Sequence, residues 1–419
     1  MKLLLLILMS FILSNQPLYA ATPLTLDEAV ATALKNHPQA IEAKENLLGA
    51  EARAGQSLAN YYPQISFAAD WSRGETFVAA LENIRLLETN TAGLSLKQTL
   101  YDFGRTAGAV DVARGNRDAT DKALTVTHQD LTLRVRSAFY LLLATEKQVV
   151  AVRETVTARE NVFRQAEEFF NQGIRAKVDV ARAEATMFAA RTSLIRAENN
   201  RELARVELAN AMGMASLEER TVVEPSAASL PLPERNVLQQ DAVRNRSELQ
   251  QFTALKLAAS GTLKSAKSGY LPILSAVATA GYADRDFPPT GTVWGVGLNL
   301  TVPLFSGFSS VEQVREATAA INSIEARQNN LKLQIIREVE SAWLGGNEAS
   351  ARILSTGKEV AAANESKFLA EGRYQEGVGS IIEVTDAQAQ ALDAQTSNIQ
   401  ARYDYYTALA RLDRAVGKQ

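Results

Sequence analysis

The feature that most constrains the fold is an internal duplication. Residues 93–96 (GLSL) align with 297–300 (GLNL) at a shift of 204 positions, and that shift aligns 93–213 with 297–417 without a gap. Further upstream the shift becomes 209, because the two copies differ by five residues between these segments. Chance does not produce a constant register over more than a hundred positions, so the chain must fold as one unit used twice.

The duplication divides the chain into four parts. Lys2 and the apolar run at 3–13 precede a small residue, Ala20, which predicts a signal peptide at 1–20. The linker contains Pro225, Pro231 and Pro233. The predicted parts are the signal peptide at 1–20, a first repeat at 21–213 (a helix, a β-hairpin at 62–103 and long helices), a linker at 214–235, and a second repeat at 236–419 with its hairpin at 271–305.

Composition excludes several classes of protein. Loss of Lys2 with the signal peptide leaves 43 Lys and Arg against 47 Asp and Glu, a net charge near −4. Such a chain lacks the basic surface that nucleic acid requires. It has no cysteine, hence no disulfide and no lipid-modified cysteine, and its two histidines cannot form a histidine-rich metal site. We predict no cofactor, no metal and no nucleic-acid partner.

Each repeat contains two segments with the alternation of a β-strand. Trp294, Val296, Leu298 and Leu300 alternate with small or polar residues, so one face of that strand is apolar. The other three candidates begin near Ile65, Leu94 and Leu274. No later stretch has enough continuous apolar residues for a membrane helix, so any membrane crossing must use these strands.

Four strands are too few to close a membrane barrel, which needs about eight or more. Because open sheet edges are not tolerated in lipid, the simplest solution is that several copies share one barrel. Three copies would supply twelve strands. The hairpin tips at 72–90 and 284–291 are predicted to be exposed loops.

The helical segments carry a seven-residue seam. Alanine recurs at every seventh position, which lets helix axes approach closely along a narrow contact line. The seam residues are Ala183, Ala190, Ala197, Ala204 and Ala211 in the first repeat, and Ala387, Ala394, Ala401, Ala408 and Ala415 in the second. The 66 residues at 105–170 contain no proline and would extend about 100 Å as a helix. Such helices suit the wall of a water-filled tube, although a solid coiled coil would show the same seam.

In this order, and doubled, the motifs resemble the TolC-like outer membrane efflux protein family over essentially all of the mature chain. The matching segments are Tyr62-Pro63 and Leu271-Pro272 before strands, 100–105 (LYDFGR) and 303–307 (PLFSG) after strands, and 374–380 (YQEGVGS) followed by 383–388 (EVTDAQ). The resemblance implies a mixed α and β membrane protein. In it, a trimeric twelve-stranded β-barrel with four strands per chain continues as a twelve-helix periplasmic α-barrel.

The resemblance also implies partners and a site. A homotrimer in outer membrane lipid would dock on a periplasmic adaptor (a membrane fusion protein), which is attached to an inner membrane transporter. Family tunnels close at the periplasmic end, where acidic side chains face the pore, and Glu383 and Asp386 occupy the matching positions. Six carboxylates around a narrow opening would attract cations. The alternative is that both are solvated acids favoured by the dipole at a helix start.

The resemblance places the adaptor contacts at two tips, Gly173-Ile174-Arg175 and Gly377-Val378-Gly379. Some family members carry an arginine two residues after the second tip glycine, where it helps to hold the gate shut. Here that position is Gly379, and Arg175 stands at the equivalent position of the first repeat. Whether Arg175 replaces the missing arginine is left open by the sequence.

Two other classes of protein compete with an export channel. A periplasmic coiled-coil tether would show the seams, but it would have neither the alternating strands nor the duplicated hairpins. An exported enzyme would need a site, and nothing gathers the acidic residues of this chain into one. Within the family, efflux of solutes is the broader expectation, and type I protein secretion is the alternative.

Overall fold

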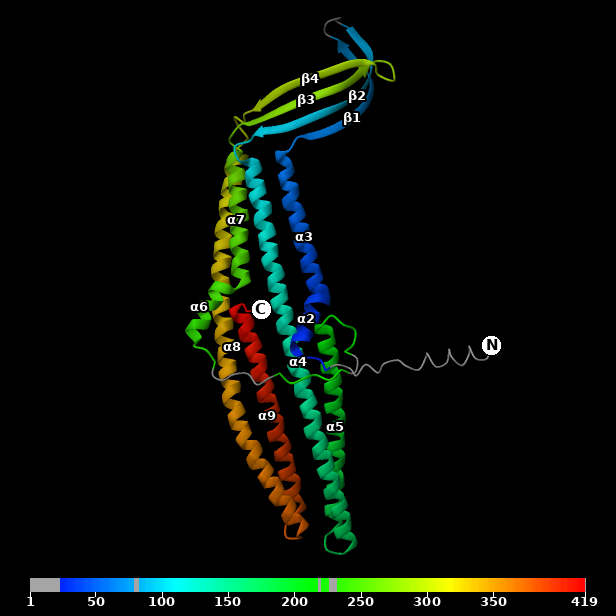
Figure 1. Ribbon diagram of the computed structural model, residues 1–419, viewed down its shortest axis with the longest axis vertical. Helices are drawn as coiled ribbons and strands as arrows, with labels where there is room; N and C mark the ends of the chain where they lie inside the picture. The colour runs from blue at the N-terminus through cyan, green and yellow to red at the C-terminus, as the bar shows by residue number, and fades with distance from the viewer. Residues whose placement is uncertain (1–22, 79–82, 218–219, 226–231, 419) are drawn as a thin grey trace, which may run out of the picture. The chain divides into compact units, whose positions relative to one another are not determined.

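The structure, a computed structural model, describes residues 23–78, 83–217, 220–225 and 232–418. The predicted signal peptide at 1–20 lies outside these residues. Figure 1 labels the elements. The first repeat contains α2 (Leu26–Asn36), α3 (Pro38–Leu58), the 3₁₀ turn η1 (Ala59–Tyr61), β1 (Gln64–Val78), β2 (Asn83–Tyr101), α4 (Arg105–Asn171) and α5 (Lys177–Ala211). The second contains α6 (Arg235–Asn245), α7 (Ser247–Ser268), β3 (Ile273–Asp284), β4 (Gly291–Thr301), α8 (Ser309–Gln375) and α9 (Ile381–Val416).

The structure repeats the duplication element by element. Helices α4 and α8 each have 67 residues, and both their first and their last residues are 204 positions apart. Helices α2 and α6 each have 11 residues and lie 209 positions apart at both ends. The change of shift therefore falls within the strand hairpins, where β1 and β2, with 15 and 19 residues, are longer than β3 and β4, with 12 and 11.

The strands form one antiparallel sheet in the order β1-β2-β3-β4 (Figure 1). Strands β1 and β3 begin directly after Pro63 and Pro272, as predicted. The described chain leaves the apolar face of the sheet uncovered, because Trp294, Val296 and Leu298 are 76%, 77% and 72% exposed. An exposed apolar patch of this kind is costly in water. Lipid or another protein surface must therefore cover this face of the sheet.

The prediction of an exposed loop at 72–90 was wrong. Strand β1 continues to Val78 and β2 begins at Asn83, with an unbroken pairing register from Gln64↔Lys97 to Val78↔Asn83. Polar residues interrupt the alternation there, yet they pair across the strands. The indole nitrogen of Trp71 donates to a carboxylate oxygen of Glu88 at 3.0 Å. The loop at 284–291 is confirmed, since β3 ends at Asp284 and β4 begins at Gly291.

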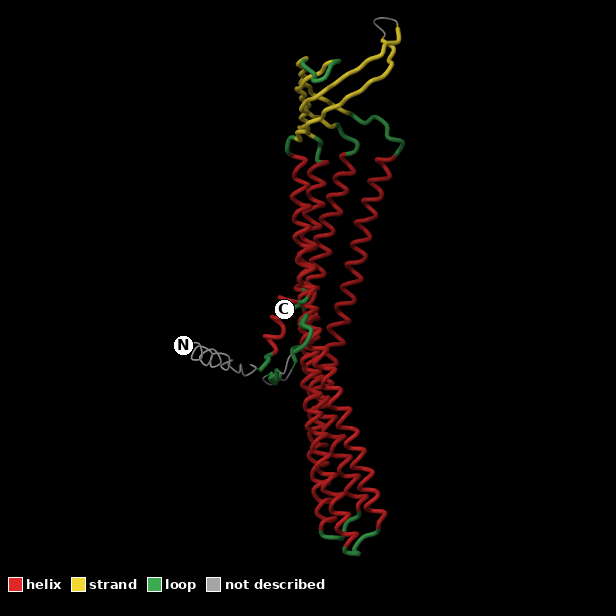
Figure 2. The backbone as a smooth tube through the Cα atoms, turned by 90° about the vertical axis from the view of Figure 1, so that its right-hand side faces the viewer, coloured by secondary structure: helices red, strands yellow, loops and turns green. Residues whose placement is uncertain are grey.

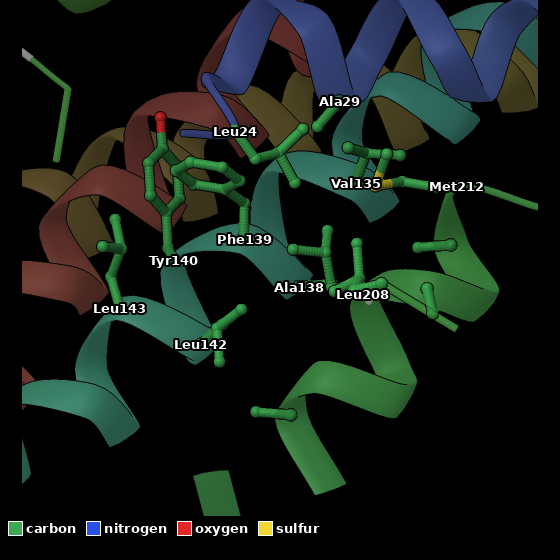
Figure 3. Close-up of a cluster of buried hydrophobic side chains, with 14 of the residues drawn as sticks. Leu24, Ala29, Val135, Ala138, Phe139, Tyr140, Leu142, Leu143, Leu208 and Met212 are labelled. Carbon is green, nitrogen blue, oxygen red and sulfur yellow. The ribbon is translucent and has the colours of Figure 1, made fainter. Parts of the chain in front are cut away.

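The chain divides into two compact units, which are described separately. The first comprises Met1–Ile41, Thr127–Asn245 and Ile335–Gln419. A buried cluster in this unit gathers side chains from α4, α5 and α9 around α2 and the segment that enters it (Figure 3). Leu24, Phe139 and Leu208 are all within 1% of full burial. Leu24 also forms a parallel bridge with Val222, which fastens the linker beside α2.

The alanine seams predicted for α5 and α9 are buried in this unit. Ala183 and Ala211 are fully buried, as is Ala401, whereas Phe188 and Ile195 on another side of α5 are 52% and 67% exposed. Helix α5 therefore uses a narrow contact line and keeps other faces open, as predicted. The prediction was wrong for the C-terminal half of α9, where Tyr403, Tyr405 and Tyr406 are buried in addition to the seam alanines. No helix in the described part of the chain is both long enough and apolar enough to cross a membrane.

The second unit comprises Glu42–Val126 and Arg246–Gln334, and it contains the sheet. Here α4 and α7 touch backbone to backbone. A Cβ atom added to Gly108 would lie 2.7 Å from the carbonyl oxygen of Gly261, and one added to Gly115 would lie 2.6 Å from the backbone nitrogen of Ala258. Lys264 and Asp111 form an ion pair of 3.0 Å beside this contact. Only glycine permits so close an approach at these positions.

Candidate functional site at the paired helical tips

Two short turns in the first unit join α4 to α5 and α8 to α9; Figure 2 shows them as green loops at the ends of red helices. Both use the same backbone hydrogen bonds. In the first, the amide of Ile174 donates to the carbonyl oxygen of Phe169 at 2.9 Å; in the second, Val378 donates to Arg373 at 3.0 Å. Gly173 and Gly377 have φ values of 75° and 76°, the left-handed conformation that ends a helix and favours glycine.

The tips differ at the position of the family arginine. The amide of Gly379 lies 2.8 Å from the carbonyl oxygen of Arg373, whereas the equivalent distance from Arg175 to Phe169 is 3.3 Å. In this tighter turn, a Cβ atom at position 379 would approach the backbone nitrogen of Tyr374 to 2.9 Å. The second tip therefore has no room for a side chain at 379 without a backbone shift.

Arg175 bridges the two tips. Its Nη2 atom donates to the carbonyl oxygens of Gly377 at 2.8 Å and of Gly379 at 2.6 Å. Its guanidinium also lies 5.9 Å from the centre of the Tyr374 ring, within reach of a cation–π interaction. A hydrogen bond from a charged donor contributes about 1.5–3 kcal/mol, so this bridge is a substantial link between hairpins.

A buried cluster packs the helices together directly behind the tips. Tyr374 is its largest member and is 1% exposed, with its ring 5.7 Å from that of Phe169. Burial raises the pKa of the Tyr374 hydroxyl. The negative charge of Asp179 also raises this pKa, whereas the positive charge of Arg175 lowers it. The cluster contains Val162, Ala166, Ala183, Ala370, Tyr374, Ile381, Val384 and Ala387.

Glu383 and Asp386 lie at the start of α9 with their side chains exposed, whereas Val384 and Ala387 between and beside them are buried. Ser380 caps this helix, and its hydroxyl accepts from the amides of Ile382 and Glu383. Glu383 lies 3.5 Å from Arg373, and both side chains of this ion pair are about half exposed (49% and 60%). Asp386 has no ion-pair partner in the described residues.

The structure thus brings the predicted tip residues together. Arg175 contacts two residues of the second tip, and Ile174 and Val378 remain 54% and 72% exposed. Sequence reasoning missed Arg373 and Tyr374. The sequence did contain a signal for Arg373. This residue lies four positions before Gly377, and the turn at Gly377 brings the start of α9 back beside it. The described residues contain no group of three side chains able to hold a metal ion.

This chain is similar in sequence to known proteins of the outer membrane. A family model described as outer membrane efflux protein matches residues 29–214 and 238–418. The outer membrane protein TolC of Salmonella enteritidis is 26% identical over 376 residues, covering 85% of this chain and 74% of TolC. The alkaline protease secretion protein AprF of Pseudomonas aeruginosa is 23% identical over 333 residues, covering 76% of this chain and 68% of AprF.

Solved structures extend the likeness to the fold. The Campylobacter jejuni CmeC outer membrane channel superposes with a TM-score of 0.84 at 16% sequence identity. The match covers 94% of this chain and 85% of CmeC. At this identity the likeness concerns the fold, which includes the strands and both pairs of long helices.

Proposed function

Because the chain belongs to the outer membrane efflux protein family, we propose that it exports small solutes through a tunnel whose narrowest point lies at the second tip. It is an outer membrane channel with a periplasmic helical domain, and the family is not enzymatic. Family members form trimeric channels within tripartite pumps. The uncovered apolar face of the sheet supports contact with outer membrane lipid, and three copies would close a twelve-stranded barrel.

The placement of Glu383 and Asp386 carries the proposal of a constriction. They are three residues apart on α9 and both side chains are exposed, whereas the adjacent residues Val384 and Ala387 are buried. Three copies would present three unpaired carboxylates from Asp386 and three Glu383 carboxylates partly compensated by Arg373. A ring of this charge favours cations over anions in a narrow opening.

The exposed tip residues support docking on a periplasmic adaptor. Ile174 and Val378 occupy equivalent positions in the two repeats, and each is followed four residues later by another exposed apolar residue, Val178 or Ile382. The same small apolar surface is thus displayed twice per chain. An adaptor that covers both copies would couple the tunnel to an inner membrane transporter.

The two acidic residues should contribute unequally to selectivity. Asp386→Ala is expected to reduce the preference for potassium over chloride more than Glu383→Ala, because Arg373 already offsets part of the Glu383 charge. The measurement is the reversal potential in a KCl gradient across a planar bilayer. Asp179→Ala, at the first-repeat position equivalent to Glu383, serves as the control. If wild type and Asp386→Ala show the same preference for potassium over chloride, Asp386 does not line the constriction.

Type I protein secretion is the second candidate, favoured by the likeness to AprF, whose name states secretion. The two candidate functions predict different phenotypes in cells that lack the protein. Loss of the protein would sensitise cells to small toxic solutes in the first case, and would deplete a secreted protein from the medium in the second.

A further inference from the structure

A cavity of about 450 Å³ lies between α4, α8 and α9 in the first unit, away from the tips. Its floor is apolar and built mainly from small side chains. Ala342, Ala408 and Ala415 are 9%, 8% and 4% exposed. The apolar lining residues are Leu133, Ala342, Gly345, Ala408 and Ala415. This size falls within the range of about 300–1,000 Å³ typical of small-molecule sites.

A missing side chain creates part of this space. A Cβ atom added to Gly345 would meet no atom within 4 Å. The aligned position of the first repeat is Leu141. Glycine is unfavourable in a helix interior, and no close helix contact requires it here. The second repeat therefore has an open volume where the first carries a leucine.

The lining of the cavity is cationic. It includes Arg337, Arg411 and Arg414, against one acid, Glu338. Arg414 lies 2.6 Å from Asp130. Arg337 and Arg411 are exposed and have no ion-pair partner in the described part of the chain. The aligned residues of the first repeat are Leu133, Glu207 and Asn210, so the charge belongs to the second repeat alone.

We propose that this cavity binds a small organic anion with an apolar body, such as an aromatic carboxylate. The guanidinium groups of Arg337 and Arg411 would hold the carboxylate, since arginine presents paired donors that match its two oxygens. The apolar floor would take the ring. Both parts are needed, because an exposed ion pair by itself contributes little. The site is independent of the constriction proposed at the tips.

The test uses the purified full-length channel in detergent and the probe 4-(trifluoromethyl)benzoate, whose ¹⁹F line broadens on binding. The neutral 4-(trifluoromethyl)benzamide controls for partition into micelles. Wild type should bind the benzoate saturably and roughly tenfold more tightly than the amide, because only the benzoate forms charge-assisted bonds. Arg337→Gln and Arg411→Gln should each remove most of that preference.

A second variant tests the contribution of the apolar cavity separately from that of the arginine charges. Gly345→Leu should abolish binding of the benzoate while leaving α8 folded, because a Cβ atom at position 345 meets nothing within 4 Å and the longer side chain would occupy the open volume. Gly372→Leu, at another position of α8 where a Cβ atom meets nothing within 4 Å, is the matched control. Equal binding of benzoate and benzamide, no saturable binding by wild type, or full binding by Gly345→Leu would each overturn the proposal.

Discussion

Replacement of Arg175 by leucine is expected to raise the conductance of the channel several-fold. The substitution removes both hydrogen bonds that tie the first tip to the carbonyl oxygens of Gly377 and Gly379. Loss of about 2 kcal/mol per chain would shift the equilibrium between joined and separated tips by roughly thirtyfold. The tips would then separate for a larger fraction of the time, and the opening that they border would widen.

Single-channel current through the variant in planar bilayers measures this effect. Arg182→Leu is the control, because Arg182 is an exposed arginine near the start of α5 with no ion-pair partner in the described residues. The control should conduct as wild type does. If Arg175→Leu also conducts as wild type, Arg175 does not hold the tips together.

Gly115→Ala is expected to destabilise the second unit by about 1–3 kcal/mol, the usual cost of forcing a methyl group into a filled contact. The added Cβ atom would lie 2.6 Å from the backbone nitrogen of Ala258 and 2.8 Å from the carbonyl oxygen of Ala254. Backbone atoms cannot rotate away, so α4 and α7 must move apart. The gain in helix propensity, about 1 kcal/mol, offsets only part of this cost.

Gly55→Ala in α3 is the control that separates the effect of the α4–α7 contact from the effect of helix propensity. It lies in the same unit, and a Cβ atom there meets nothing within 4 Å. Thermal unfolding followed by circular dichroism should show Gly55→Ala at or above the wild-type midpoint and Gly115→Ala below it. Equal midpoints for the two variants would mean that α4 and α7 are not in backbone contact.

The sequence predicts the long elements well because local patterns determine them. A prolineless run gives α4, alanine at every seventh position gives the seams, and Pro63 and Pro272 mark the entries to β1 and β3. The error at 72–90 has a physical origin. Alternation reports which face is apolar, and it stops where polar residues such as Arg73 and Glu88 occupy both strands, whereas the backbone ladder continues.

The contacts between distant segments could not be predicted in this way. The bonds of Arg175 join turns more than 200 residues apart, and they depend on how two hairpins pack rather than on any local pattern. The ion pair between Arg373 and Glu383 differs in origin, because it is a local contact across a single turn. The duplication predicted that the tips are alike, and the structure adds that the second is tighter and excludes a side chain at Gly379.

Single-channel recording of the purified, detergent-extracted protein in planar bilayers tests the central claim most directly. We expect wild type to show discrete, cation-selective openings, and the Glu383→Ala/Asp386→Ala double variant to open but to lose most of that selectivity. The opposite result is a protein that stays in solution without detergent and never inserts. That outcome would contradict an outer membrane channel and would favour a periplasmic tether.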